Sequence, residues 1–508
     1  MINADHKRNA TTVRVESGLL AGVASADGSI LVFKGVPYAA PPVGELRWRP
    51  TQPPLAWAGE RQADTFGPIC PQLGPPPGSF YQQEFYLHEE PQSEDCLYLN
   101  VWTAASQTER RPVMVWFHGG ALVEGSGSLP SFHGEALARK GVVLVTVNYR
   151  LGMFGYFAHP ALSAESEQHV SGNYGLLDQI AALRWVRDNI TAFGGDPENV
   201  TVFGQSAGAM SVFALLVSPL ASGLFQRAIG QSGSPFSLRE LRTLHQAEQA
   251  GADRATAWGA AELVELRALS AATLLGTRDA ASFANRGGLT IDGWALPANP
   301  AQMMADGRRH AVALLVGATA DEWTPMGGGT ALDADTFGQQ ARQRYGERAA
   351  EFLRLYALES NADASRAQIA SMSDLMFAGM RTWAEAQSAH GPQPAYVYYF
   401  DRKLPGRDSA FFGAFHSSEL YYVFDTLHTT DRPWEAADQH LADVMTSYWA
   451  NFAATGDPNG DGLPAWPAFD GPNAPVMQLG EQIGAQAMPK PEQMAFFAKD
   501  IAAWLDRA

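Results

Sequence analysis

The chain has few cysteines, few basic side chains and no long apolar run. Only Cys70 and Cys96 carry thiols among its 508 residues, too few and too far from histidine for a zinc site. Acidic side chains outnumber basic ones by 53 to 36, and the formal charge of −17 repels phosphate backbones and anionic membranes. This balance excludes nucleic-acid binding as a function.

The N-terminal stretch MINADHKRNATTVRVESG lacks the apolar segment of a signal peptide. No uninterrupted apolar run reaches the about 18 residues that a membrane helix needs. We therefore expect a cytoplasmic protein without a membrane partner, and we expect a monomer. A bridge between Cys70 and Cys96 would contribute about 3 kcal/mol in an oxidising compartment, whereas reducing cytosol favours thiols. The sequence is compatible with either state.

The most informative stretch is a sharp bend, residues 204–208 (GQSAG), between two apolar runs. Residues 200–203 (VTVF) are typical of a strand, and residues 209–216 (AMSVFALL) are typical of a helix. In a G-x-S-x-G elbow, small neighbours permit a strained serine backbone that projects the hydroxyl beside the helix N-terminus. The pattern predicts that Ser206 is a nucleophile. The alternative is a glycine-rich turn with a capping serine.

A second bend follows residues 112–117 (PVMVWF), an apolar run typical of a strand buried on both faces of a parallel sheet. The run ends in a glycine-rich turn, residues 118–121 (HGGA). Such a turn can aim backbone N–H groups at the oxyanion that forms when a serine attacks a carbonyl. An ordinary glycine loop is the alternative.

An acid and a base follow later strands. Residues 311–319 (AVALLVGAT) form a further buried-strand pattern, followed at once by Asp321 and Glu322, and residues 395–400 (AYVYYF) precede a loop that reaches His416. Ligands of open α/β sheets bind at the carboxyl ends of the strands, where these candidates fall. The order serine, acid, histidine is that of α/β-hydrolases.

The alternation of strands and helices predicts an α/β fold. We expect a central, mostly parallel twisted sheet flanked by helices, formed by one domain over residues 1–508. Residues of about 238–280 and 335–387 are rich in alanine, leucine and charge, which predicts helical insertions around the active site. Residues 74–90 contain several aromatics and are predicted to be a loop; a gate over the site and surface packing explain them equally well.

The sequence resembles the type-B carboxylesterase and lipase family, which includes bacterial para-nitrobenzyl esterases, liver carboxylesterases and cholinesterases. Residues 193–208 (FGGDPENVTVFGQSAG) are similar to its serine signature, and residues 94–102 (EDCLYLNVW) to its second signature. Ala104 stands where a proline is usual. The resemblance spans nearly the whole chain, and its pattern is most similar to the para-nitrobenzyl esterases.

This resemblance implies an α/β-hydrolase fold and a serine carboxylesterase without metal or other cofactor. It places the nucleophile on Ser206, the acid on Glu322 and the base on His416. The oxyanion donors would be the backbone N–H groups of Gly120, Ala121 and Ala207. Ala121 replaces a third glycine found in many relatives, and Trp323 replaces a usual glycine, but neither change removes a backbone donor.

Other polar residues have competing interpretations. His118 is interpreted as a residue that shapes its loop rather than as a second base, and Asp321 as a neighbour of the acid rather than the acid itself. Glu419, three residues after His416, is interpreted as a capping or salt-bridged carboxylate. The resemblance also implies structural ion pairs, and the residues for them are Arg47 with Glu94 and Asp95, and Arg150 with Asp178.

The expected substrates are small or medium aryl or alkyl carboxylic esters. No tryptophan lies between Cys70 and Cys96, which disfavours choline esters because those are held by cation–π contact. Several aromatics indicate an apolar substrate pocket, although core packing explains them equally well: Phe283, Trp294, Phe411, Phe412 and Phe415. The alternatives are a hydrolase of carbamates or activated amides, and a non-catalytic, neuroligin-like binding protein on the same fold.

Overall fold

The computed structural model of the chain describes residues 12–86, 89–237, 241–260, 262–276, 287–326, 332–406 and 408–507. Its backbone forms two compact units. The first comprises Met1–Arg227, Glu240–Asn299 and Ala453–Thr455, and the second Ala228–Arg239, Pro300–Phe452 and Gly456–Ala508. A single domain over the whole chain stays a prediction.

The first unit contains most of the strands. They are β1 (Thr12–Val15), β2 (Gly18–Ala21), β3 (Val23–Ala24), β4 (Leu31–Pro37), β5 (Glu60–Gln62), β6 (Tyr98–Thr103), β7 (Arg111–Phe117), β8 (Val143–Val147), β9 (Gly195–Gln205), β11 (Arg242–Thr243) and β12 (Thr290–Ile291). Neighbours in the main sheet follow the order β9-β7-β8-β6-β4-β3. β7 pairs in parallel with β8 and β9, and the other pairs are antiparallel. Every residue of β8 is buried, as expected for a strand covered on both faces.

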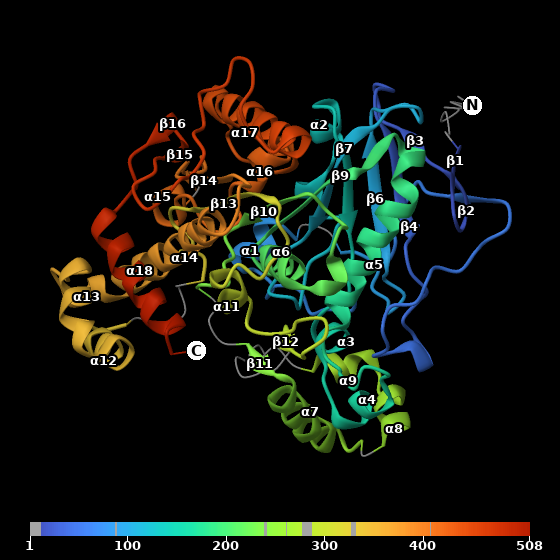
Figure 1. Cartoon of the computed structure of the whole chain (residues 1–508), viewed down its shortest axis with the longest axis horizontal. Coiled ribbons are helices and arrows are strands. Elements are labelled where there is room, and N and C mark those ends of the chain that lie inside the picture. Colours follow the sequence, from blue (N-terminus) through green and yellow to red (C-terminus); the bar gives the residue numbers. More distant parts are fainter. Residues whose placement is uncertain are drawn as a thin grey trace. The chain divides into compact units, whose positions relative to one another are not determined.

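Helices of the first unit accompany this sheet, and some of them pack directly on it (Figure 1). They are α1 (Phe80–Glu84), α2 (Glu135–Arg139), α3 (Gly152–Tyr156), α4 (Pro160–Glu165), α5 (Tyr174–Asn189), α6 (Ala207–Val217), α7 (Leu244–Trp258), α8 (Leu263–Ala268) and α9 (Ala271–Leu275). α6 and α5 pack against β9, and α2 packs against β6 and β8. The strand, elbow and helix predicted around residue 206 are thus β9, a one-residue bend and α6.

The second unit has its own strands and helices. The strands are β10 (Arg227–Gln231, in this unit from Ala228), β13 (Ala313–Thr319), β14 (Ala395–Phe400), β15 (Val476–Leu479) and β16 (Ile483–Gln486). The helices are α11 (Pro300–Ala305), α12 (Ala334–Tyr345), α13 (Ala349–Leu355), α14 (Ala364–Ala389), α15 (Ser409–Phe412), α16 (Leu420–Val423), α17 (Ala436–Thr455) and α18 (Pro491–Leu505). β14 pairs in parallel with β13 and β15, and α14 packs on β13 and β14.

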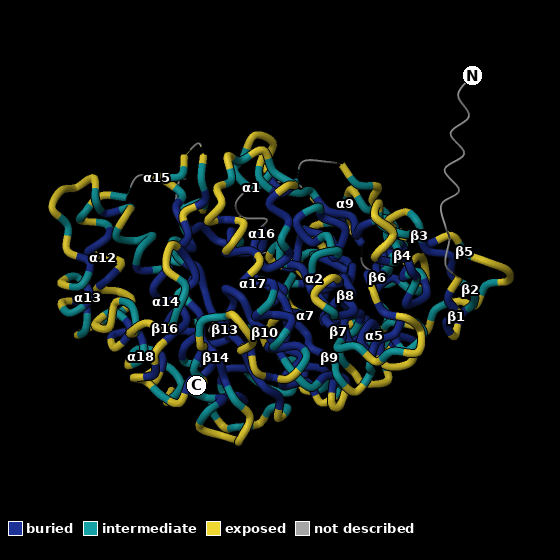
Figure 2. The backbone as a smooth tube through the Cα atoms, turned by 90° about the horizontal axis from the view of Figure 1, so that it is seen from above, coloured by how far each residue is buried: buried dark blue, intermediate teal, exposed yellow. Residues whose placement is uncertain are grey.

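Each unit has an aromatic core, and strands β8 and β13 are buried along their whole length, the dark blue class of Figure 2. In the first unit the Trp116 ring lies 4.9 Å from Phe132 and 4.8 Å from Phe203. In the second, Tyr398 and Trp449 lie 5.4 Å apart. Side chains of this size, fully buried, each contribute about 1.5–3 kcal/mol by leaving water. These cores fix the strands whose ends carry the candidate site.

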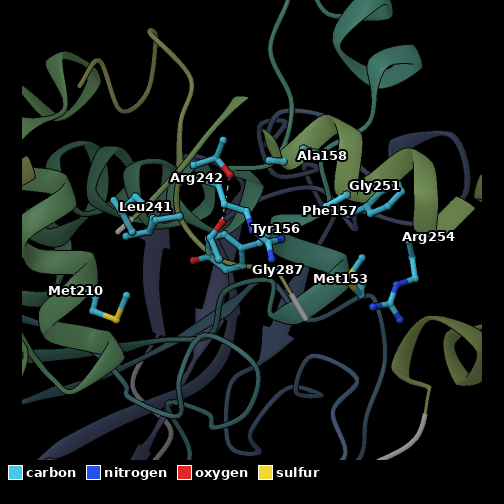
Figure 3. A pocket seen from close by; sticks show the side chains of 15 residues that line it. Met153, Tyr156, Phe157, Ala158, Met210, Leu241, Arg242, Gly251, Arg254 and Gly287 are labelled. Atoms are coloured by element: carbon cyan, nitrogen blue, oxygen red, sulfur yellow. Dashed lines mark hydrogen bonds between the residues drawn. The ribbon is translucent and has the colours of Figure 1, made fainter. Parts of the chain in front are cut away.

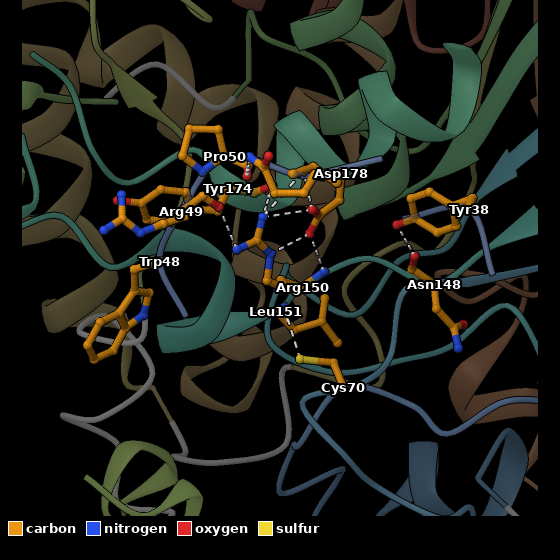
Figure 4. A network of polar contacts seen from close by, with 12 residues as sticks. Tyr38, Trp48, Arg49, Pro50, Cys70, Asn148, Arg150, Leu151, Tyr174 and Asp178 are labelled. Carbon is orange, nitrogen blue, oxygen red and sulfur yellow. Dashed lines mark hydrogen bonds and ion pairs between the residues drawn. The ribbon is translucent and has the colours of Figure 1, made fainter. Parts of the chain in front are cut away.

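One expected ion pair, Arg150–Asp178, lies buried in the first unit (Figure 4). The buried Arg150 guanidinium donates through Nε and Nη2 to the Asp178 carboxylate, both at 2.8 Å. Arg47 Nε donates to Glu94 at 2.7 Å, so both pairs are confirmed. The expectation for Asp95 was wrong, since it forms no ion pair within the residues that the structure describes.

Residues 74–90 differ from the predicted loop because they contain α1. This helix begins where the Ser79 hydroxyl accepts a hydrogen bond from the Gln82 N–H at 3.4 Å, and the Tyr81 and Phe85 rings stack along it. Ser79, as a capping residue, was the local signal for this helix, but the prediction relied on the aromatic residues instead.

Cys70 and Cys96 are both buried free thiols. A hydrogen bond with Cys70, together with burial, raises the pKa of Cys96 well above its ordinary value. Cys70 Sγ also accepts the Leu151 N–H at 3.3 Å. In the described part of the chain, no helix combines the length and apolarity needed to cross a bilayer.

Candidate active site

The G-x-S-x-G elbow joins β9 to α6. Ser206 occupies the bend with φ 57° and ψ −122°, a strained conformation for a residue with a side chain. Its flanking glycines are sterically required. A Cβ on Gly204 would lie 2.4 Å from the carbonyl carbon of Gly208, and a Cβ on Gly208 would lie 1.9 Å from the Phe117 oxygen. The G-x-S-x-G spacing therefore follows from the close approach of the elbow to β7.

The glycine-rich turn after β7 lies directly on this elbow. A Cβ on Gly119 would meet the Gln205 oxygen at 2.9 Å and the Ser206 Cβ at 3.2 Å. Gly120 has φ 102° and Ala121 has φ 54°, so the alanine accepts a left-handed conformation here. The turn that the sequence predicted is thus brought together with Ser206.

The backbone N–H groups of Gly120, Ala121 and Ala207 are among those in this region that have no acceptor among the described residues. The N–H of Ala207 belongs to the first turn of α6, where helix geometry leaves donors unpaired and favours negative charge. Unpaired donors beside a serine hydroxyl are what a developing oxyanion requires. They coincide with the donors expected from the sequence.

The candidate acid, Glu322, and the candidate base, His416, are in contact within the second unit. β13 ends at Thr319, and the chain turns so that the fully buried Glu322 carboxylate accepts a hydrogen bond from His416 Nδ1. The other carboxylate oxygen accepts the Thr319 N–H at 2.8 Å. Because each oxygen has its own donor, the carboxylate is held in one orientation toward the imidazole.

Asp321 has a different role from its neighbour. Its carboxylate accepts the Ala414 N–H at 2.9 Å, and its own N–H donates to the Ala414 oxygen at 3.0 Å. Gly413, with φ 61°, is required beside it, because a Cβ there would lie 2.1 Å from the Asp321 carboxylate. Asp321 therefore holds the loop that carries His416 in place through two hydrogen bonds to Ala414.

Charge around His416 favours its protonated form. Burial of the imidazole opposes protonation, but the charge and hydrogen bond of Glu322, with the charge of Glu419, raise the pKa of His416 above its ordinary 6.5. The surroundings thus stabilise the imidazolium that would form when this side chain accepts a proton.

Glu419 is the carboxylate whose environment the sequence did not reveal. It starts α16 without a side-chain capping bond, and it forms no ion pair in the described part of the chain, so the expected cap or salt bridge was wrong. Instead its buried Oε1 accepts from Gln231 Nε2 at 3.2 Å, while Oε2 has no partner among the described residues. Burial, reinforced by the charge of Glu322, raises its pKa to about 7. Its spacing of three residues from His416 was the available signal.

His118 shapes the glycine-rich turn of residues 118–121. Its ring stacks on Tyr149 at 4.5 Å, its Nδ1 contacts the Gly119 oxygen at 2.8 Å, and its own carbonyl accepts the Tyr149 hydroxyl at 2.7 Å. Burial lowers its pKa to about 4, so it is neutral at physiological pH. These contacts agree with a role in shaping its loop.

The remaining candidates are placed separately. Ser206 and the glycine-rich turn of residues 118–121 belong to the first unit, whereas Glu322 and His416 belong to the second. Trp323, the other departure from the family pattern, donates its N–H to Ser373 Oγ at 3.3 Å. Among the proposed pocket aromatics Phe415 is buried, Trp294 and Phe412 are half-buried, and Phe411 is exposed; Phe283 lies outside the described residues.

Comparison with known proteins decides the family. Residues 9–497 match the carboxylesterase family along nearly the whole chain. The chain belongs to the carboxylesterase family. Para-nitrobenzyl esterase of Bacillus subtilis is 38% identical over 493 residues, which cover 92% of this chain and 95% of the relative. Fumonisin B1 esterase of Sphingopyxis macrogoltabida is 37% identical over 490 residues, which cover 92% of this chain and 86% of the relative.

Solved structures of carboxylesterases agree with this assignment. A para-nitrobenzyl esterase structure matches with a TM-score of 0.82 and 34% identity, covering 96% of this chain and 99% of its own. A carboxylesterase of Geobacillus stearothermophilus matches with a TM-score of 0.81 and 35% identity, covering 96% and 100%. This carboxylesterase has the α/β-hydrolase fold and is a carboxylic ester hydrolase.

Proposed function

We propose that Ser206, Glu322 and His416 form the catalytic triad of a serine esterase. The observation that carries the proposal is the strained Ser206 elbow beside three unpaired backbone N–H groups. The Glu322–His416 pair supports it, because a buried acid on Nδ1 leaves Nε2 of the imidazole as the proton acceptor. The same combination serves acyl transfer on several unrelated folds.

In the proposed reaction, His416 accepts the Ser206 proton as the serine oxygen attacks the ester carbonyl. Glu322 holds the imidazole tautomer and stabilises the imidazolium. The oxyanion binds the N–H groups of Gly120, Ala121 and Ala207, each worth about 3–4 kcal/mol of transition-state stabilisation. The imidazolium then protonates the leaving alcohol, and water hydrolyses the acyl-enzyme through the same histidine.

We propose small or medium aryl and alkyl carboxylic esters as substrates. The relatives named as esterases support this class, and carbamates or activated amides are the second candidate because the same acyl-enzyme serves them. The sequence-based expectation of a monomer in the cytoplasm stays a prediction, and light scattering of the purified protein tests its oligomeric part.

The test is hydrolysis of para-nitrophenyl esters from acetate to decanoate by the wild type and by Ser206→Ala. We expect turnover of the short esters by the wild type and a loss of several orders of magnitude in the variant. Ser222→Ala changes an exposed serine of the same unit and serves as the matched control. Equal activity in Ser206→Ala and the control would disprove the proposed nucleophile.

A further inference from the structure

A pocket of about 320 Å³ opens within the first unit (Figure 3). α3, α6 and α7 contribute to its wall, together with residues of and beside β11 and β12. In Figure 3, Met210 lies on one side of the view and Arg254 on the other, with Tyr156 between them. None of the proposed triad residues lines it. Its size suits a short chain rather than a large ligand.

The charged lining of this pocket is basic as far as the described residues go. Arg242 and Arg254 line it, and no acidic residue of the described part of the chain does, although the chain as a whole carries a formal charge of −17. Arg254 makes no ion pair within the described residues; its guanidinium lies 5.9 Å from the Trp258 ring. The acidic Asp253 of α7 accepts a hydrogen bond from Gln249 at 3.1 Å and is not part of the lining. Two guanidinium groups beside apolar side chains such as Met153 and Met210 fit a carboxylate at the end of an apolar arm.

Two helices of the pocket wall, α6 and α3, are connected to the proposed reaction centre. Met210 of α6 lies four residues after Ser206, a distance of about 6 Å along the helix axis. α3, which carries Met153 and Tyr156, is bonded to the residue that follows the proposed oxyanion turn (residues 118–121), because the Gly152 N–H donates to the Leu122 oxygen at 2.7 Å. The pocket and the nucleophile therefore share supporting elements of one unit.

Small residues keep the pocket open. The lining includes three small residues of α7, Ala247, Ala250 and Gly251. It also includes Gly287 and Gly288, which precede β12 in the sequence. A Cβ built on Gly288 would meet no heavy atom of the described residues within 4 Å, and its φ lies outside the left-handed region. A larger side chain at Gly288 would accordingly be accommodated by the described residues without straining the backbone.

We propose that this pocket binds the carboxylate-bearing arm of an anionic ester, with Arg254 and Arg242 as the cationic partners. The substrate class is thus esters that carry a free carboxylate on the acid or the alcohol side. This inference rests on the proposed esterase function and narrows its substrates. Arg242 and Arg254 act as specificity residues and take no part in bond cleavage.

Two matched substrate pairs test the proposal in a pH-stat assay. In the first, monomethyl glutarate is compared with methyl 5-methylhexanoate, where an isopropyl group replaces the carboxylate on the acid side. In the second, 4-acetoxybutanoate is compared with 4-methylpentyl acetate, which makes the same change on the alcohol side. The quantity measured is the ratio of kcat/KM for the anionic ester to kcat/KM for its neutral partner.

The variants are Arg254→Gln and Gly288→Leu. For at least one pair, we expect Arg254→Gln to lower the ratio about 10-fold, the effect of one charge-assisted contact in a partly open site. Gly288→Leu, by filling the pocket, should lower the same ratio. The matched controls are Arg184→Gln, an exposed arginine of the same unit, and Gly391→Leu, an open glycine outside the pocket.

Each outcome bears on the proposal. A ratio lowered by Arg254→Gln and Gly288→Leu but not by the controls supports it. Ratios that stay equal to those of the controls in both pairs, with the neutral esters hydrolysed, overturn the pocket assignment and leave the esterase function intact. A wild type that hydrolyses neither these esters nor the para-nitrophenyl series overturns both.

Discussion

Replacing Glu322 by glutamine is expected to abolish most esterase activity without unfolding the protein. The carboxylate accepts two hydrogen bonds at once, from the Thr319 N–H at 2.8 Å and from His416 Nδ1. A glutamine has one acceptor oxygen and one NH₂ group, so in one of these two contacts the NH₂ group must face an N–H that is also a donor, and that hydrogen bond is lost. If the oxygen stays on Thr319, the NH₂ group faces Nδ1 and selects the tautomer protonated on Nε2, which cannot accept a proton from a serine.

The size of the effect follows from that tautomer. The corresponding acid-to-amide change in a serine-hydrolase triad lowers kcat about 10⁴-fold, which corresponds to about 5 kcal/mol of transition-state stabilisation. Steady-state hydrolysis of para-nitrophenyl butyrate at pH 8 measures kcat. Thermal unfolding of the same samples separates a catalytic defect from a folding defect.

Asp321→Asn is the matched control for this prediction. In the wild type the Ala414 N–H lies 2.9 Å from the Asp321 carboxylate. Asparagine keeps an oxygen that can accept this N–H, so the hydrogen bond remains and only the negative charge of its acceptor is lost. We expect a stability loss of about 1 kcal/mol and kcat within about 10-fold of the wild type. If Asp321→Asn were as inactive as Glu322→Gln, or if Glu322→Gln kept wild-type activity, the assignment of the acid would be refuted.

Three further predictions follow from the buried charges and the glycines. Activity should fall as pH drops through the pKa of His416, which lies above 6.5, because the base must be neutral. Glu419, whose pKa is raised to about 7, is negatively charged above that pH and then favours the imidazolium, so Glu419→Gln should move the acid limb of kcat/KM to lower pH; an unmoved limb would contradict the coupling. Arg150→Met should cost about 3–5 kcal/mol in urea unfolding, since it leaves the fully buried Asp178 charge unpaired, and a loss below about 1 kcal/mol would contradict that account. Gly208→Ala should cost about 3 kcal/mol or more, because its Cβ would lie 1.9 Å from the Phe117 oxygen, whereas a normal melting temperature would show that the elbow can shift.

The elements around the site could be predicted because their signals are local. The apolar runs of β7, β9 and β13, and the glycine bends after β7 and β9, are continuous stretches of sequence. The choice of Glu322 over Asp321 was less secure from residues alone, since both carboxylates follow the same strand. The structure separates their contacts, with Glu322 on His416 and Asp321 on the backbone of Ala414.

Features made by distant residues could not be predicted in this way. Glu419 differs from a surface glutamate only through burial and through its hydrogen bond from Gln231, which lies 188 residues earlier. The basic pocket likewise combines α3, α6 and α7. Neither α3 nor α7 carries a motif that singles out its lining residues. The short helix α1 was missed for a local reason, because its serine cap stood within a run of prolines, glycines and aromatics.

The central claim is that Ser206 is the nucleophile of this carboxylesterase, and covalent labelling tests it most directly. The wild-type protein is treated with a fluorophosphonate, and the modified residue is located by mass spectrometry of its peptides. The account predicts one phosphonate on Ser206, formed in step with the loss of esterase activity, and a rate of labelling lowered by orders of magnitude in His416→Ala. Complete inactivation with the label on another residue, or labelling of Ser206 with no loss of activity, would contradict it.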